Sequence, residues 1–500
     1  MMADVLLLNA RVLTLDPAHP IASAIAVRGG RVLAVGRVDD LREVAGSITQ
    51  TIDCEGGVAI PAFHDAHCHL LAWARFTSGL DCRHIDSIEG LQAQLTKRAA
   101  NAPAGEWVRG NGYDEALLGR QPDRRDLDAA VPDRPVRLQH RSLHLDVLNS
   151  KALQTTGLSA SDDRRVERDP ATGEATGRIF SAGDLLRDRT PRPPYATLAE
   201  NVSRATDQLL AWGVTSVQDA SFTNGEGEWE LFHRLAAEGH LRVRTFMLVG
   251  SPHWREVCRW RSESRLVRHG PVKLMLDEAT SDPDDFRREL HAARKAGRAV
   301  AVHAASEAEV ATAVDALRSA PPGPLPTPNR LEHGSVVPDG LLEELRGVGA
   351  TVVGQPALVS ERGDVYRAEY RPEQHGWLHR ARSFLAAGVP YAVGSDAPVT
   401  EPNPATGLSA ALHRTTKSGA ALGRDEALPV IEALRAFTLG PAEAVGVGCE
   451  LGRIRPGMIA DIAVLDPDAL NPDRESGVER LVRATIMEGS VVWRAGAREA

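Results

Sequence analysis

Side chains of the types that bind or bridge metal ions follow short apolar runs at several places in this chain. They are His67 and His69, which flank Cys68, and then Lys273, His303, His333 and Asp396. Imidazole and carboxylate groups bind divalent cations, and such a cation activates water for hydrolysis. The sequence therefore predicts a metal-dependent hydrolase.

The spacing of these residues gives the prediction its strength. His67 and His69 lie two apart, so in an extended segment both rings share one face and can reach one ion. Lys273, His303 and His333 follow one another at intervals of 30 residues, about one strand and helix each. Asp396 comes 63 residues after His333, which is about two such repeats.

Lys273 lies inside the apolar run PVKLML of a chain whose 58 basic residues include only five lysines. A lysine in such a run is rarely buried without a partner. Burial lowers the pKa of an amine, and the neutral amine can react with carbon dioxide to give a carbamate that bridges two cations. The alternative is a lysine whose stem is buried while its charge reaches the strand edge.

Each of the other residues also has a structural explanation. Two histidines at this spacing occur by chance, and a lone histidine such as His303 or His333 is often satisfied within a core. An aspartate at the position of Asp396 is common as a strand-to-helix turn or helix N-cap. These alternatives stay open on the residues alone.

The elements that would position these side chains form a repeated pattern of strand and helix. Eight apolar runs are predicted as strands, the first over 58–63. The others are GVTSVQD, LRVRTFMLVG, PVKLML, RAVAVHA, NRLEHG, ATVVGQP and VPYAVGSD. Eight parallel strands with helices between them predict a (β/α)₈ TIM-type barrel, with a doubly wound sheet as the alternative. The count requires an insertion at about 71–196, which we expect to shape the pocket.

The sequence pattern at both ends of the chain differs from the strand and helix repeat of its middle part. Residues 5–53 alternate short apolar runs with turns, including Gly29-Gly30 as a hairpin signal, and similar runs return at 460–466 and 484–493. We predict a small β-sandwich domain built from both chain ends. Its parts would be 1–56 and 446–500, and the hydrolase barrel would span 57–445.

Composition narrows the class of partner. The 500 residues carry a formal net charge of −9, which argues against a nucleic-acid-binding surface and favours a small-molecule substrate. The five cysteines are scattered and odd in number, which indicates a reducing compartment rather than a disulfide framework. No run of 18 apolar residues and no signal-peptide pattern is present. We expect a cytoplasmic protein that does not bind membranes.

With these motifs in hand, the chain resembles the amidohydrolase superfamily. The resemblance is to the branch that contains N-substituted formamide deformylases and related metal-dependent hydrolases. The motifs that carry it are PAFHDAHCH, KLML, AVAVH, RLEHG, AVGSDAPV and GRIRPGMIADIAVLD, with DRPVRLQHRSLHLDVLNSKAL in the insertion. The loops LDEATSD and HAASE depart from the family's pattern, so the particular substrates of relatives are not expected to transfer.

The resemblance implies roles for the residues. One divalent ion, for which zinc is favoured, would be held by His67 and His69 and a second by His303 and His333. Carbamylated Lys273 would bridge the two ions if the centre is binuclear. Asp396 would complete the site as ligand and as general base and acid. Two further implications are a homodimer and a catalytic and substrate-binding role for His144 in the substrate pocket, although His144 fits equally as a surface histidine.

The reaction that this resemblance implies is attack of metal-activated water on a carbon–nitrogen bond outside a peptide chain, such as an amide, formamide or N-acyl bond. Two alternatives stay open. One is a deaminase of a heterocyclic amine on the same barrel, commonly with one metal. The other is a non-catalytic scaffold that has kept the barrel, against which the complete ligand set argues.

Overall fold

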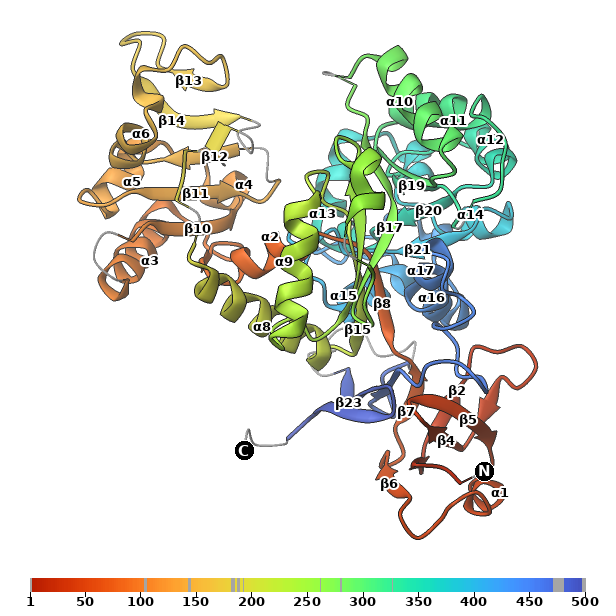
Figure 1. Ribbon diagram of the computed structural model, residues 1–500. Coiled ribbons are helices and arrows are strands. Elements are labelled where there is room, and N and C mark those ends of the chain that lie inside the picture. Colours follow the sequence, from red (N-terminus) through yellow and green to blue (C-terminus); the bar gives the residue numbers. More distant parts are fainter. Residues whose placement is uncertain are drawn as a thin grey trace. The chain divides into compact units, whose positions relative to one another are not determined.

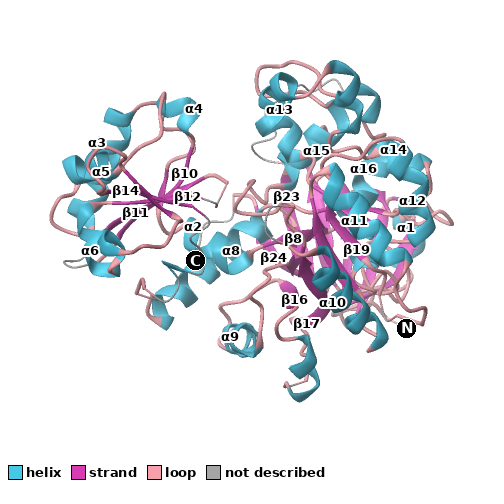
Figure 2. Cartoon of the chain, turned by 90° about the horizontal axis from the view of Figure 1, so that it is seen from above, coloured by secondary structure: helices cyan, strands magenta, loops and turns pink. Residues whose placement is uncertain are grey.

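The structure is a computed structural model that describes residues 2–102, 106–142, 145–180, 185–186, 189–191, 193–260, 262–278, 281–325, 327–470 and 481–496. The chain divides into two compact units, one formed by Met1–Leu70 and Thr206–Ala500 and the other by Leu71–Ala205. Figures 1 and 2 show sheets and helices in both units.

The first unit contains the predicted barrel (Figure 1). Eight parallel strands pair in chain order, as expected of runs that are buried on both faces. The strands are β8 (Phe63–Cys68), β15 (Val214–Asp219), β16 (Arg244–Gly250), β17 (Val267–Met275), β18 (Val300–Ala304), β19 (Arg330–His333), β20 (Thr351–Gly354) and β21 (Tyr391–Val393). The (β/α)₈ prediction is confirmed.

The first and last strands of this sheet meet at a seam. The backbone N–H of Asp396 donates to the carbonyl of His67 at 2.7 Å, and that of His69 donates to the carbonyl of Ala397 at 2.8 Å. Cys68 and Ala397 form a parallel bridge at the same place. The contact that brings the barrel ends together therefore also places Asp396 beside the histidine pair.

The predicted first strand, 58–63, is wrong as a barrel strand. Its residues divide between two sheets: β7 (Val58–Pro61) pairs with two strands of the terminal domain, and the barrel strand β8 begins at Phe63. The transfer occurs at Ala62, whose N–H donates to the carbonyl of Asp461 in the terminal domain, while the next N–H, of Phe63, donates to Gly213 beside β15. An unbroken apolar run does not reveal this change because both sheets bury it.

Helices connect the barrel strands. Those after the insertion are α8 (Tyr195–Ala211), α9 (Glu226–Ala237), α10 (Pro283–Lys295), α11 (Glu307–Arg318), α12 (Gly340–Val348), α13 (Ala357–Glu369), α14 (Arg382–Ala386), α15 (Pro404–His413), α16 (Val430–Phe437) and α17 (Leu439–Ala444), with a 3₁₀ helix at Trp254–Arg259. Asp282 is the N-cap of α10, and Ser306 with Glu309 forms a capping box at the start of α11. Within the described ranges, no helix combines the length and apolar character that crossing a membrane requires.

The two chain ends build the predicted small β domain from two sheets. The first is ordered β5 (Arg31–Gly36), β4 (Ala24–Arg28), β1 (Val5–Leu8) and β6 (Gln50–Asp53), and α1 (Val38–Arg42) follows β5. The second is ordered β24 (Ser490–Arg494), β23 (Val482–Met487), β22 (Ile462–Leu465), β7, β2 (Arg11–Leu13) and β3 (Ile21–Ala22). One apolar cluster includes buried residues of both sheets, among them Leu7, Ile25, Ala59, Ile462 and Ile486. Strands from both ends therefore share one core.

The second unit has a sheet and core of its own. After α2 (Leu70–Phe76), six strands pair in the order β13 (Val166–Arg168), β14 (Ala175–Phe180), β12 (Leu145–Leu148), β11 (Val136–His140), β10 (Val108–Tyr113) and β9 (Leu80–Asp81). Its helices include α3 (Ile88–Asn101), α4 (Glu115–Leu118), α5 (Arg124–Ala130) and α6 (Ser150–Thr156). Leu91, Leu127 and Leu138 are among the fully buried residues of its core. This segment was predicted only as an insertion, without an assigned fold.

Candidate metal centre

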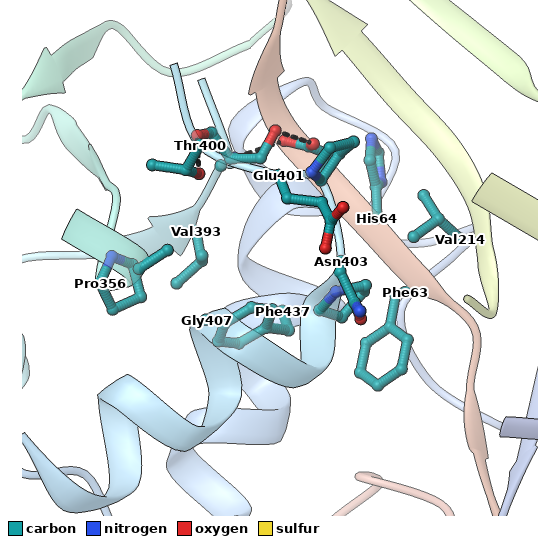
Figure 3. A pocket seen from close by; sticks show the side chains of 16 residues that line it. Phe63, His64, Val214, Pro356, Val393, Thr400, Glu401, Asn403, Gly407 and Phe437 are labelled. Atoms are coloured by element: carbon teal, nitrogen blue, oxygen red, sulfur yellow. Dashed lines mark hydrogen bonds between the residues drawn. The ribbon is translucent and has the colours of Figure 1, made fainter. Parts of the chain in front are cut away.

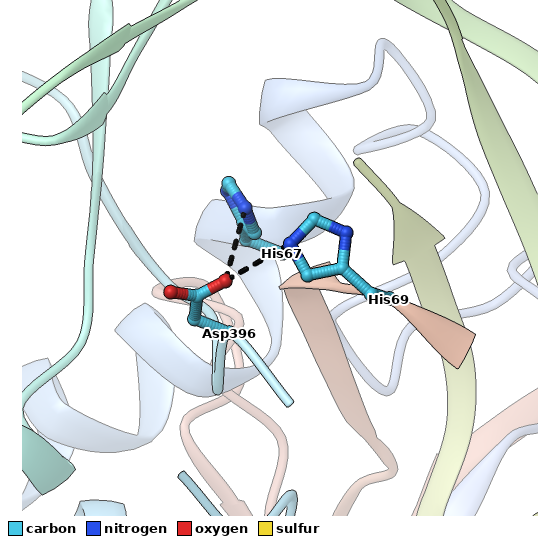
Figure 4. A group of neighbouring side chains, drawn as sticks. All are labelled: His67, His69 and Asp396. Carbon is cyan, nitrogen blue, oxygen red and sulfur yellow. Dashed lines mark ion pairs between the residues drawn. The ribbon is translucent and has the colours of Figure 1, made fainter. Parts of the chain in front are cut away.

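Three predicted residues form a compact group at the barrel seam. The ligand atoms of His67, His69 and Asp396 lie within 4.8 Å of one another. Oδ1 of Asp396 lies 3.5 Å from Nε2 of His67 and 3.2 Å from Nε2 of His69, and both rings turn toward this oxygen in Figure 4. Two imidazole nitrogens and one carboxylate oxygen thus face a common point.

The far side of each ring in this pair is held by a hydrogen bond. Nδ1 of His67 lies 2.5 Å from a carboxylate oxygen of Glu332, and Nδ1 of His69 lies 3.0 Å from the hydroxyl of Ser221. Metal-binding histidines characteristically make such a bond with the nitrogen that does not bind the metal, which fixes the tautomer and the ring orientation. The arrangement leaves both Nε2 atoms directed at Asp396.

The other two predicted histidines stand next to this group. The ring centres of His67 and His333 are 4.9 Å apart, and those of His333 and His303 are 4.5 Å apart. Nδ1 of His333 donates to the side-chain oxygen of Gln355 at 3.0 Å, so this ring is also held from behind. The structure therefore brings the four histidines into one chain of adjacent rings.

Burial keeps the imidazoles of His67, His303 and His333 neutral. It lowers the pKa of His67 and of His333 to about 4, and the positive charge of Lys273 acts in the same direction. The pKa of His303 is also lowered, first by burial and then by His333. Neutral imidazole is the form that binds a metal.

Lys273 lies on β17 and is 2% exposed. Among the described residues, no group accepts a hydrogen bond from its Nζ. Burial lowers the pKa of Lys273 to about 8, although Glu332 and Asp396 act to raise it. A buried amine without a hydrogen-bond partner is energetically costly. Conversion of this amine to a carbamate that binds two cations would remove that cost.

Asp396 has a strained backbone, with φ of 56°. Burial opposes its ionisation, but the hydrogen bond from His69 and the neighbouring imidazoles hold the pKa of Asp396 well below its usual range. Its loop is tied to β8 through Asp65, which accepts hydrogen bonds from the N–H and hydroxyl of Ser395 at 2.9 and 2.6 Å and from the N–H of His67 at 3.1 Å. The role of Asp65 was not predicted from the sequence, because a carboxylate two residues before His67 does not by itself indicate a structural or catalytic role.

A second missed element is the ion pair behind His67. Arg330 and Glu332 are both fully buried on β19, and the guanidinium donates to the carboxylate at 2.7 and 2.9 Å. Arg330 also donates to the carbonyl of Ala66 at 2.7 Å and to the side-chain oxygen of Gln218. The sequence feature that could have predicted this ion pair is the presence of an arginine and a glutamate two residues apart in the strand segment RLEHG.

The prediction for His144 falls outside the described residues. A pocket lined by Phe63, Val214, Phe437 and the loop 400–404 is shown in Figure 3. Its walls include Asp65, but none of the six predicted ligands lines it. The candidate centre is therefore defined by the side-chain cluster and not by this pocket.

Comparisons with known proteins identify the family and the fold. A family model described as "Amidohydrolase family" matches residues 50–493. An N-substituted formamide deformylase of Arthrobacter pascens is 30% identical over 534 aligned positions, covering 98% of this chain and 98% of that protein. An uncharacterized metal-dependent hydrolase from Pyrococcus furiosus superposes with a TM-score of 0.74 at 26% identity, over 92% of this chain and 98% of its own. One from Pyrococcus horikoshii gives 0.77 at 24% identity, over 95% and 100%, and shows the fold alone.

Proposed function

Because the chain belongs to the amidohydrolase family, we propose that it hydrolyses a carbon–nitrogen bond in a small non-peptide amide, formamide or N-acyl compound. The observation that carries the proposal is the group formed by His67, His69 and Asp396, with ligand atoms within 4.8 Å of one another. The formamide deformylase, at 30% identity over nearly both full chains, supports the class of bond.

In this proposal His67 and His69 hold one divalent ion, and His303 and His333 hold a second. Lys273, if carbamylated, would supply a ligand to both ions, and Asp396 would complete the first site. The set of imidazole and carboxylate donors suits zinc. The proposal is supported by the neutral rings and by the buried Nζ of Lys273, which has no hydrogen-bond partner among the described residues.

A bound divalent cation would lower the pKa of a water molecule and polarise the substrate carbonyl. The chain's own residues provide position and proton transfer. Asp396 accepts the proton of the attacking water and gives it to the leaving nitrogen, while Glu332 and Ser221 keep the rings of His67 and His69 in place. One C–O bond forms and the C–N bond breaks, which yields a carboxylic acid and an amine.

Two substitutions separate the roles in this mechanism. Asp396→Asn keeps an oxygen at the site, so we expect it to retain metal and lose turnover by about 100- to 10,000-fold. Lys273→Ala removes the bridging group and should lose both metal and turnover. Asp284→Asn and Lys295→Ala are exposed controls on α10, and both should leave metal content and turnover unchanged. Wild-type turnover in both active-site variants would overturn the mechanism.

Metal analysis and a substrate screen distinguish the remaining alternatives. Formamides, acetamides, N-acyl amino acids and cyclic amides would be assayed with metal-loaded protein. Ammonia release from heterocyclic amines, with one metal per chain, would support a deaminase on the same barrel instead. A chain that binds no metal would be a non-catalytic scaffold.

A further inference from the structure

Near the proposed centre lies a histidine that none of these roles uses. His379 is 3% exposed, and neither of its ring nitrogens has a hydrogen-bond partner among the described residues. Buried polar groups are almost always paired, because leaving one unpaired costs its full desolvation. The ring of His379 is therefore ready to bond a group that comes from outside the chain.

The backbone holds His379 firmly in this place. Its φ of 44° is a conformation that side-chain-bearing residues rarely adopt. Its N–H donates to the carbonyl of Ser335 at 2.9 Å, and Arg414 donates to the carbonyls of His379 and Leu378, each at 2.8 Å. Strain held by several independent bonds occurs preferentially at functional sites. Because Ser335 comes two residues after His333, the strained residue is anchored beside the proposed centre.

Arg362 and His379 both lie against the ring of Tyr366. The ring centres of Tyr366 and His379 are 5.3 Å apart, and Cζ of Arg362 lies 5.9 Å from the centre of the Tyr366 ring. In the described part of the chain no carboxylate pairs with Arg362, and its buried Nε has no hydrogen-bond partner. The guanidinium of Arg362 and the imidazole of His379 are thus neighbours of the same tyrosine ring, and neither is paired with an anion among the described residues.

We propose that His379 and Arg362 form a substrate subsite that binds a carboxylate. Both residues follow β20 in the chain, Arg362 on α13 and His379 after it, and loops after barrel strands surround the mouth at which such barrels bind substrates. A guanidinium and an imidazole N–H together provide charge-assisted hydrogen bonds for a carboxylate. The substrate would then be an N-acyl amino acid or a similar acid, an inference that rests on the proposed function.

The burial of His379 agrees with a role in binding. His67 and His333 are 1% and 7% exposed, although they are proposed to bind metal ions that come from outside the chain. The 3% exposure of His379 lies within the range of these two proposed metal ligands. Arg362 is only partly buried and provides the charged, more accessible side of the subsite.

The test uses two substrates that differ only in the recognised group. N-formylglycine and N-formylglycinamide share the scissile bond, but the first carries a carboxylate and the second a neutral amide. We expect the metal-loaded wild type to prefer N-formylglycine by about tenfold or more in kcat/KM. Equal values for the two compounds would overturn the subsite.

Variants assign the preference to particular residues. Arg362→Met should remove most of the preference by raising KM for N-formylglycine, while the amide keeps its wild-type constants. Arg362→Lys should restore part of it. Arg346→Met, an exposed arginine of α12, should change neither substrate. If Arg362→Met weakens both substrates equally, the residue is structural and the proposal is wrong.

His379 requires a substitution that tolerates its backbone. Asparagine adopts positive φ more readily than most residues and keeps an amide donor, so His379→Asn should fold and retain part of the preference. His379→Phe keeps the ring size and removes the hydrogen bonds, and it should raise KM for N-formylglycine selectively. Unchanged selectivity in a folded His379→Phe would overturn the role of this residue.

Failure of the proposed function has a different signature. If neither compound is hydrolysed, calorimetric binding of the same two compounds to metal-loaded protein tests the subsite alone. Tighter binding of N-formylglycine that is lost in Arg362→Met would support the subsite while the proposed reaction fails. Equal binding of the two compounds would overturn the subsite.

Discussion

Glu332 fixes the orientation of the His67 ring, and so the direction in which its Nε2 atom could bind a metal ion. Its carboxylate lies 2.5 Å from Nδ1 of that ring and is itself held by Arg330. Burial raises the pKa of Glu332, but the charge of Arg330 and the contact with His67 outweigh this effect and hold it well below its usual range. A buried anion therefore orients a buried neutral ring.

Replacing Glu332 with glutamine tests this arrangement. Glu332→Gln keeps the shape of the side chain but removes the charge, so metal affinity should fall by about 10- to 100-fold. Because Arg330 is then buried without a counter-charge, the free energy of unfolding should also fall by about 3–5 kcal/mol. Metal titration and denaturant unfolding measure the two effects. Glu344→Gln, at an exposed ion pair, is the control, and full metal affinity in Glu332→Gln would contradict the assigned role.

The candidate ligands could be predicted from the sequence, whereas the residues that hold them could not. His67, His333 and Asp396 are recognisable because metal-binding types stand at strand ends with the period of a barrel repeat. Asp65 and Glu332 act on partners that are distant in sequence, such as Ser395, 330 positions after Asp65. Which carboxylate meets which ring depends on the register of strands that pair only in the folded barrel.

At the level of elements, apolar runs predict where strands exist but not which sheet they join. Seven predicted barrel strands are confirmed, while 58–63 divides between β7 and β8. The six-stranded sheet of the insertion was not predicted. The insertion is rich in charged residues, glycine and proline, and its half-buried strands lack the long apolar runs of the barrel strands.

The seam between β21 and β8 depends on a glycine. A Cβ atom at Gly394 would lie 2.5 Å from both Cβ and the backbone nitrogen of His67. Gly394→Ala should therefore push β8 away, lower the free energy of unfolding by about 1–3 kcal/mol, and weaken metal binding by moving His67 from Asp396. Gly347→Ala, on α12 with open space around it, is the matched control and should be neutral or stabilising. Unchanged metal affinity in Gly394→Ala would show that the seam does not set the site.

For the whole molecule, the terminal β domain was predictable because apolar alternation returns at both chain ends. In the structure that domain and the barrel belong to one compact unit, so the structure does not mark a boundary between them. The homodimer implied by the family resemblance stays a prediction, which light scattering of the purified protein can check. The structure does show ion pairs between residues of this chain that are far apart in the sequence.

One buried ion network joins the barrel to the chain's C-terminal strands. Arg244, at the start of β16, is 3% exposed and donates to Asp461 beside β22 and to Glu488 at 2.5 Å after β23. Burial of the guanidinium is compensated by these two carboxylates, which raise the pKa of Arg244 overall.

Arg244→Met would leave the buried carboxylate of Asp461 without its cation, whereas Glu488 keeps its ion pair with Arg265. We expect a loss of about 3–5 kcal/mol in the free energy of unfolding, because breaking a buried pair is far more costly than forming it is favourable. Arg242→Met, two residues earlier in an exposed pair with Asp207, should cost no more than about 1 kcal/mol. Metal affinity should stay at the wild-type value in the folded Arg244→Met protein, since the network lies at the strand end opposite to the proposed ligands. Loss of metal at full stability would mean that the terminal domain acts on the centre itself, not only on the fold that supports it.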